Sequence, residues 1–156
     1  MSNQNGADVN GLDSLITAFI GSGVMAEAMI AALLRNNILR PDQIVAADPL
    51  PERCESLQAR FGIRTTTHNR EAVRTADIVI LSIKPQVLDR VFADLGELGS
   101  LPKLVISIIA GASIAQISDG LGNPNVVRSM PNTPARIGQG ITVWAAAESV
   151  PEDRRE

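Results

Sequence analysis

The fold of this chain is decided by residues 15–35, which read LITAFIGSGVMAEAMIAALLR. Residues 15–20 are apolar on both faces, as in a strand buried within a parallel sheet. Residues 26–35 are rich in Ala, Met and Leu and predict a helix packed deeply against that sheet. Between the two segments, residues 21–26 match the GxGxxA pattern of a phosphate-binding turn. The stretch therefore predicts the first strand, turn and helix of a dinucleotide-binding domain.

The turn holds the residue types that a pyrophosphate site needs. A side chain at Gly21 would obstruct the tight passage from strand to helix, and Gly23 lets the backbone approach the pyrophosphate. Ala26 allows close packing of helix on strand. The anion would lie on the free N–H groups at the positive end of the helix dipole. The pattern also occurs in ordinary turns, but its place between a clear strand and a clear helix favours a nucleotide site.

Short apolar runs alternate with helix-like segments along the rest of the chain. We expect strands at residues 15–20, 43–47, 63–67, 77–83, 104–109, 126–129 and 141–145, and helices at 26–35, 51–60, 69–75, 85–95 and 113–121. Asn69 is expected to cap its helix. Strands separated by helices need crossover connections. The predicted fold class is therefore α/β, a Rossmann-like, doubly wound, mostly parallel sheet with helices on both faces.

The domain organisation follows from length and from the two ends. The 156 residues, 45% of them hydrophobic, suffice for one well-buried domain, which we place at residues 15–148. Residues 1–14 are polar and predict a disordered tail without a signal peptide. Ser149, Pro151 and Glu152 form the pattern of a capping box. Residues 149–156 are therefore interpreted as the start of a helix that leads to a missing domain; the alternative is a solvated charged tail.

Charge and composition exclude several classes of partner. The net charge is −3, and the basic residues are scattered rather than clustered, so nothing favours nucleic acid or an anionic membrane. The longest apolar stretches fall short of the roughly 20 residues of a membrane span. The single cysteine, Cys54, excludes an internal disulfide framework and fits a reducing compartment. We expect a soluble, cytoplasmic protein.

The end of the second predicted strand bears on the choice of cofactor. Asp48 stands where an acidic residue commonly accepts hydrogen bonds from the adenosine ribose, which favours NAD. It could also be a turn residue, and Arg53 could instead meet the 2′-phosphate of NADP. From the residues alone, the choice between NAD and NADP stays open.

Later strand ends are also expected to line the binding crevice, because ligands of open α/β sheets bind at the carboxyl ends of the strands. Lys84 is placed to meet a phosphate or a ribose hydroxyl, or is simply solvated. Asn132 offers a donor and an acceptor beside the expected nicotinamide. His68 is interpreted as a surface or capping residue and Cys54 as a packing residue. No catalytic triad order and no metal-ligand spacing occurs, so catalytic residues and metal ligands are not assigned.

Four segments together resemble the amino-terminal half of pyrroline-5-carboxylate reductase: FIGSGVMAEAMIAALL (19–34), SIKPQVL (82–88), SIIAG (107–111) and SMPNTPA (129–135). In that family the corresponding segments bind NAD(P)H. The resemblance implies a pyrophosphate site at Ile20, Gly21, Ser22, Gly23, Val24 and Met25, and an adenosine side at Asp48 and Asn69. It implies a ribose and nicotinamide side at Ser82, Ile83, Lys84, Pro85, Ile108, Ile109 and Ala110. The family often has a small polar residue in place of Asp48, so its usual preference for NADPH is in question here.

The resemblance also implies a reaction, the NAD(P)H-dependent reduction of the small molecule 1-pyrroline-5-carboxylate to proline. Family members continue into a helical domain that forms a dimer and supplies most of the substrate pocket. We therefore expect the present chain to be the cofactor-binding part, inactive alone, of a full-length homo-oligomer. Two alternatives are a stand-alone dinucleotide-sensing module and another NAD(P)-dependent imine or ketone reductase.

Overall fold

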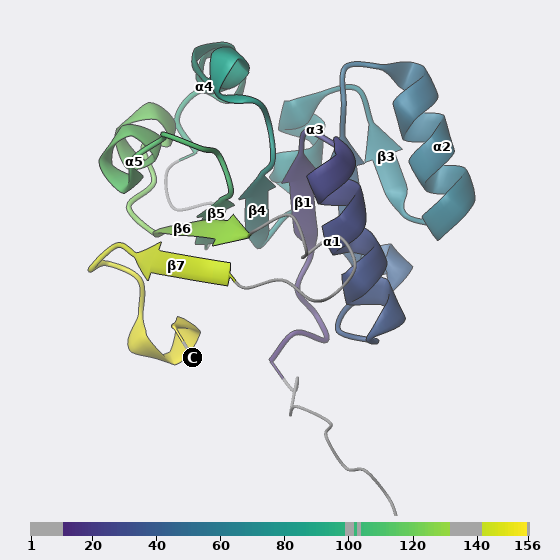
Figure 1. Ribbon diagram of the computed structural model, residues 1–156, viewed down its shortest axis with the longest axis horizontal. Coiled ribbons are helices and arrows are strands. Elements are labelled where there is room, and N and C mark those ends of the chain that lie inside the picture. The colour runs from purple at the N-terminus through teal and green to yellow at the C-terminus, as the bar shows by residue number, and fades with distance from the viewer. Residues whose placement is uncertain (1–10, 99–101, 103, 132–141, 156) are drawn as a thin grey trace, which may run out of the picture.

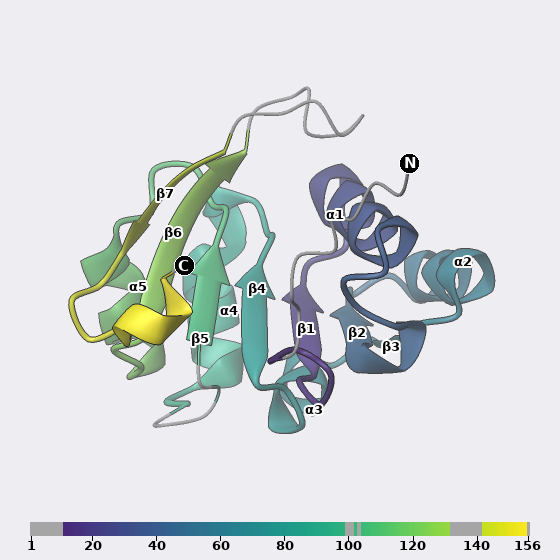
Figure 2. The same cartoon turned by 90° about the horizontal axis from the view of Figure 1, so that it is seen from below.

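A computed structural model describes residues 11–98, 102, 104–131 and 142–155. Its centre is one seven-stranded sheet in the order β3-β2-β1-β4-β5-β6-β7 (Figures 1 and 2). The strands are β1 Thr17–Ile20, β2 Ile44–Ala47, β3 Arg64–Thr66, β4 Ile78–Leu81, β5 Leu104–Ser107, β6 Val126–Pro131 and β7 Thr142–Ala146. The first six strands pair in parallel, and β7 pairs antiparallel with β6 at the sheet edge. The predicted α/β, mostly parallel, doubly wound sheet is confirmed.

Helices connect the parallel strands. They are α1 Val24–Arg35, α2 Pro51–Phe61, α3 Asn69–Arg74, α4 Leu88–Leu95 and α5 Ile114–Leu121. Single 3₁₀ turns lie at η1 Pro41–Gln43, η2 Pro85–Val87 and η4 Glu152–Arg154. No helix among the described residues is long and apolar enough to cross a membrane.

The central strands β1, β2 and β4 are buried on both faces of the sheet. One apolar cluster joins α1 and α2 to the sheet, with Phe19, Ile30 and Leu57 fully buried. The other joins α3, α4 and α5 to the opposite face around Val79 and Ile117. A strand covered on both sides is nearly all apolar, which is the pattern seen in β1, β2 and β4, where Thr17 is the one polar residue.

Several predicted boundaries differ from the structure. The helix predicted over residues 85–95 divides into the 3₁₀ turn η2 and α4. Asn69 does not cap α3: His68 is the N-cap residue, and the Asn69 amide donates to Asp94 Oδ2 at 2.9 Å on α4. A neighbouring helix thus offers this amide a tertiary partner. Residues 1–10 of the predicted tail lie outside the described residues, and Leu12 packs against the core.

The predicted capping box at Ser149 is wrong. The Ser149 hydroxyl donates to the Pro124 carbonyl oxygen at 2.6 Å, and the short turn η4 begins after Pro151 without a side-chain cap. The Arg155 guanidinium folds back onto the carbonyl oxygens of Ala147 and Glu148. Ser149 is therefore bound to the domain by a tertiary hydrogen bond and Arg155 by local ones, and residues 152–154 form a 3₁₀ turn in place of a regular α-helix.

Candidate functional site

The site lies where the order of the strands reverses. β1 is flanked by β2 on one side and β4 on the other, so the chain moves outward from β1 in both directions. At such a point the loops after the strands diverge and leave room for a ligand at the carboxyl ends. The glycine turn follows β1 directly. The segment of residues 82–85 follows β4 beside it, and the Ser82 N–H donates to the Ile20 carbonyl oxygen at 2.9 Å.

No other residue type fits at Gly21 in the turn. Its φ is +86°, in the left-handed region that favours glycine. A Cβ atom there would lie 2.7 Å from Ile83 Cγ2 and 2.9 Å from the Ser82 carbonyl oxygen. The Ser82 hydroxyl lies 2.6 Å from the Gly21 carbonyl oxygen, to which it donates. The β4 end therefore fixes the start of the turn.

Gly23 has the opposite environment. A Cβ atom at this position would have no heavy atom within 4 Å, and Gly23 is exposed. It is the N-cap residue of α1 and gives the helix no side-chain cap. The N–H groups of Val24, Met25 and Ala26 lie in the first turn and therefore have no partner inside the helix. Open space in front of uncapped N–H groups is the arrangement that binds a phosphate.

Asp48, one residue after β2, holds the glycine turn from the other side. Its Oδ2 accepts from the Ser22 N–H at 3.1 Å and from the Ser22 hydroxyl at 2.9 Å. Its Oδ1 accepts from the Leu50 N–H at 3.1 Å, which is the bond of an Asx turn. Ser22 is fully buried. The ribose and turn interpretations of Asp48 are thus compatible, because Oδ1 keeps capacity for one further bond.

Two arginines of α2 converge on one carboxylate of α1. Glu27 forms ion pairs with Arg53 and Arg60, and Arg53 Nε also donates to the Ser22 carbonyl oxygen at 2.7 Å. Burial acts to raise the pKa of Glu27. The hydrogen bonds and positive charges of the two arginines outweigh that effect and lower the pKa below its ordinary value of 4.5. Glu27 therefore stays ionised at neutral pH and pairs with both guanidinium groups.

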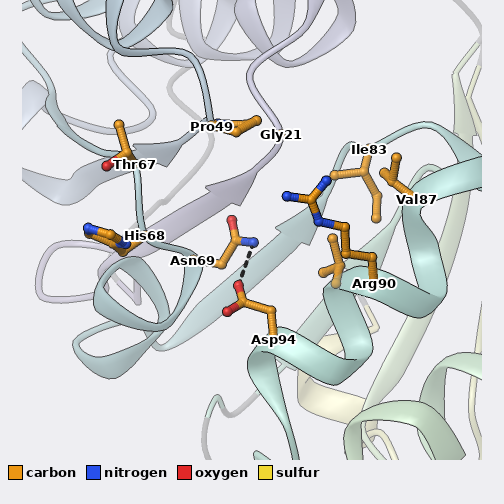
Figure 3. Close-up of a pocket in the computed structure, with 10 residues that line it drawn as sticks. Gly21, Pro49, Thr67, His68, Asn69, Ile83, Val87, Arg90 and Asp94 are labelled. Carbon is orange, nitrogen blue, oxygen red and sulfur yellow. Dashed lines mark hydrogen bonds between the residues drawn. The ribbon is translucent and has the colours of Figure 1, made fainter.

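A cavity of about 300 Å³ opens beside the turn, at the lower limit for pockets that hold small ligands (Figure 3). The lining comes from the ends of β1, β2, β3 and β4, from the start of α3, and from one face of η2 and α4. It comprises Gly21, Pro49, Thr67, His68, Asn69, Ile83, Val87, Arg90, Val91 and Asp94. Of these, the sequence analysis assigned Gly21, Asn69 and Ile83 to the site.

The wall formed by η2 and α4 was missed. Val87, Arg90, Val91 and Asp94 recur at the spacing of one helical face, and this spacing was the signal that could have found them. Figure 3 shows the Arg90 side chain reaching back from α4 toward Ile83, and Asn69 bonded to Asp94 across the cavity. His68 is exposed and is the N-cap residue of α3, in line with its interpretation as a surface or capping residue, and it also lines the cavity.

The remaining predicted site residues are distributed along the same sheet edge. Lys84 and Pro85 are exposed at the β4 end, and Ala110 is exposed beyond β5. The Ile108 N–H donates to the Leu81 carbonyl oxygen at 3.1 Å, which ties the two strand ends together. Ile109, by contrast, is buried in the core, so its side chain contributes packing. Asn132 lies outside the described residues.

Two further side chains were interpreted from the sequence. Cys54 is buried, with its sulfur 3.3 Å from the Thr66 carbonyl oxygen, and burial raises the pKa of its thiol. A raised pKa disfavours the nucleophilic thiolate, which agrees with a packing role. Within the part of the chain that the structure describes, no group of His, Cys, Asp and Glu side chains could hold a metal ion.

Comparison with known proteins connects this geometry to a family. Residues 16–111 match the family described as "NADP oxidoreductase coenzyme F420-dependent". The chain is 40% identical over 141 residues to a pyrroline-5-carboxylate reductase of Synechocystis, covering 90% of this chain and 52% of the relative. It is 34% identical over 137 residues to the Escherichia coli reductase of that name, covering 86% and 51%. The chain thus spans about half the length of these relatives.

Solved structures agree on the fold. A pyrroline-5-carboxylate reductase from Coxiella burnetii matches with a TM-score of 0.86 at 31% identity, over 92% of this chain and 53% of that one. A pyrroline carboxylate reductase from Plasmodium falciparum, solved with NADP bound, matches with a TM-score of 0.80 over 93% and 53%. At 24% identity the second match shows the fold alone.

Proposed function

The chain belongs to the coenzyme F420-dependent NADP oxidoreductase family, and we propose that it binds a nicotinamide dinucleotide for the reduction of 1-pyrroline-5-carboxylate to proline. The observation that carries the proposal is the glycine turn, which leaves open space before the uncapped N-terminus of α1. The similarity to pyrroline-5-carboxylate reductases supports the choice of substrate.

We assign described residues to successive parts of the dinucleotide. The N–H groups of Val24 and Met25 would bind the pyrophosphate, and the cavity beyond Gly21 would receive the adenosine. Lys84 and Ala110, exposed at the ends of β4 and β5, would flank the ribose and nicotinamide. In this order the dinucleotide lies across the carboxyl ends of the strands at the switch point, with its nicotinamide end toward the later strands β4 and β5.

Orientation is the contribution we assign to this chain. When bound, the dinucleotide supplies a hydride from nicotinamide C4 to the imine carbon, and a proton at the ring nitrogen completes proline. The rate then depends on holding donor and acceptor in line, which can account for a large part of a barrier. Gly21 and Ser82 fix the turn on the sheet edge, so the pyrophosphate would be held in one place relative to β4 and β5.

Calorimetric titration of the 156-residue chain with NADH and with NADPH tests the binding step. We expect one molecule bound per chain, with a dissociation constant in the micromolar range for at least one of them. Lys84 is exposed and positively charged, whereas Met25 offers no charge to the anion. Lys84→Ala should therefore weaken binding of the dinucleotide several-fold. Failure of both dinucleotides to bind at millimolar concentration would contradict the proposal.

The reaction is tested separately. Pyrroline-5-carboxylate and a dinucleotide are incubated with the chain, and proline is quantified by mass spectrometry. We propose that the relatives' full length is needed for the substrate pocket and for a homo-oligomer, so the 156 residues alone should form little proline. Rapid proline formation by these residues would contradict the proposal that the full length is needed.

The proposed location is the cytoplasm, where reduced dinucleotides and free thiols such as Cys54 are maintained.

A further inference from the structure

The adenosine end of the site distinguishes between the two nicotinamide dinucleotides. They differ by one phosphate on the adenosine 2′-oxygen, and in this fold that oxygen lies near the end of β2. An acidic residue there accepts a hydrogen bond from a free hydroxyl, whereas an arginine there pairs with a phosphate. This chain carries both types, Asp48 and Arg53, and their contacts show which one is available.

Asp48 is held in a position to accept. Its three hydrogen bonds, two from Ser22 and one from Leu50, fix both oxygens at the edge of the glycine turn. Pro49, the next residue, lines the cavity. The remaining capacity of Oδ1 suits a ribose hydroxyl, which donates. It does not suit a phosphate ester, which carries about −1.5 to −2 charges at neutral pH.

Arg53 is already engaged. Its Nε binds the Ser22 carbonyl oxygen, and its terminal nitrogen is ion-paired with Glu27. Glu27 also takes the second arginine of α2, Arg60. The two arginines and the two carboxylates Asp48 and Glu27 therefore balance, and a phosphate placed beside Asp48 would add negative charge that no free arginine of α2 offsets.

We propose that this chain selects NADH over NADPH, with Asp48 as the discriminating residue and Glu27 as the positioning residue that withholds Arg53. The inference rests on the proposed function, because it concerns the same dinucleotide site. It assigns a preference opposite to the cofactor named in the family description.

Arg90 is the cation that could oppose this selection. It lies on α4, across the cavity from Pro49, with Asp94 one turn further along the same face (Figure 3). From that wall it would meet the adenine and not the 2′-oxygen at the β2 end. Arg90→Ala should therefore weaken the binding of NADH and the binding of NADPH by the same factor.

The test is calorimetric titration of the full 156-residue chain with NADH and NADPH, and with the fragments 5′-AMP and 2′,5′-ADP, which isolate the adenosine end. We expect NADH to bind about tenfold more tightly than NADPH or better, which corresponds to at least about 1.4 kcal/mol. Adding the 2′-phosphate to the fragment should also weaken binding. Asp48→Asn should reduce the preference to about threefold or less, because it removes the like charge.

Glu27→Gln distinguishes positioning from mere support. Freed Arg53 should improve NADPH binding several-fold while NADH binding changes less than about twofold; a purely structural loss would weaken both equally. Asp42→Asn is the matched control, since Asp42 is exposed and paired with Arg40 away from the site. NADPH binding as tight as NADH, or a ratio unchanged in both site variants, would overturn the inference while leaving the proposed function intact. Failure of both dinucleotides to bind would overturn the proposed function itself.

Discussion

At the residue scale, the two glycines of the turn do different work. Gly21 supports the fold, because its positive φ and its contacts with Ile83 and Ser82 leave no room for a side chain. Gly23 leaves space for a ligand, because nothing in the described structure lies near its missing Cβ. One sequence pattern thus combines a structural requirement with a binding requirement, and substitution separates them.

Gly21→Ala should destabilise the domain by about 2–4 kcal/mol, from left-handed backbone strain and overlap with the β4 end. Urea unfolding followed by circular dichroism measures the loss. Gly23→Ala is the control and should unfold within about 0.5 kcal/mol of the wild type, since the added methyl group meets open space. Equal stability of the two variants would show that the turn is not packed against Ser82 and Ile83 as described.

Glu27 gives a prediction about pH. Its pKa is lower in the folded chain than the ordinary 4.5, so the folded state favours the ionised form. That contribution to stability is complete above the unfolded-state pKa and is lost as the pH falls through the folded-state pKa. At neutral pH, Glu27→Gln should cost roughly 1 kcal/mol, because the ion pairs are partly exposed.

Urea unfolding of both proteins between about pH 7 and pH 3 measures this contribution. The difference in unfolding free energy between wild type and Glu27→Gln should be constant down to about pH 5 and then shrink. A difference that grows on acidification would mean that the arginines do not stabilise the Glu27 carboxylate.

At the element scale, the packing of α4 on α5 depends on one missing side chain. A Cβ atom at Gly120 would lie 2.4 Å from the Phe92 ring, closer than any stable contact. The sequence predicted a helix over residues 113–121, and the structure shows that the Ser113 hydroxyl caps α5 by accepting from the Gln116 N–H. It did not explain a glycine inside the helix, because the reason lies in the neighbouring element.

Gly120→Ala tests this contact. Helix propensity alone favours the change by up to about 1 kcal/mol, but overlap with Phe92 should cost about 1–3 kcal/mol. We therefore expect net destabilisation in urea unfolding, and partial recovery when Phe92→Leu is added. Ser118→Ala in the same helix is the control and should be nearly neutral. Stabilisation by Gly120→Ala would contradict the described packing of the two helices.

Elements were predictable where one local signal decided them. The strands β1, β2 and β4 follow from continuous apolar runs, and α2 from Pro51 at its first position. Prediction failed where a distant partner took over a side chain. Asn69 binds Asp94 instead of capping α3, and Ser149 binds Pro124 instead of starting a helix.

At the scale of the whole molecule, the candidate site divides in the same way. The turn and the strand ends were predictable because parallel strands bring their carboxyl ends to one edge. The α4 wall with Arg90 and the Glu27 ion pairs were not, since they depend on how helices pack on the finished sheet. The α4 wall and the Glu27 ion pairs concern which dinucleotide is bound and how tightly, more than whether the site exists.

The exposed apolar side chains of the edge strand β7 lead us to expect self-association in solution. Val143 is 70% exposed and Trp144 53% exposed, on opposite faces of the strand, and Met130 lies beside Val143 on β6. Exposed apolar groups on an unpaired strand edge favour association. We expect the apparent mass in light scattering to rise with concentration, and to rise much less for Val143→Thr/Trp144→Ser. A monodisperse monomer at high concentration would contradict this.

The central claim is that the glycine turn of this chain binds the pyrophosphate of a nicotinamide dinucleotide. Its most direct test is calorimetric titration of NADH into the wild type and into Gly23→Ala, two proteins of matched stability. The account predicts micromolar binding at one site per chain for the wild type, and binding at least about tenfold weaker for Gly23→Ala, because the added methyl group blocks the approach to α1. Equal affinity of the two proteins, or no binding to either, would contradict it.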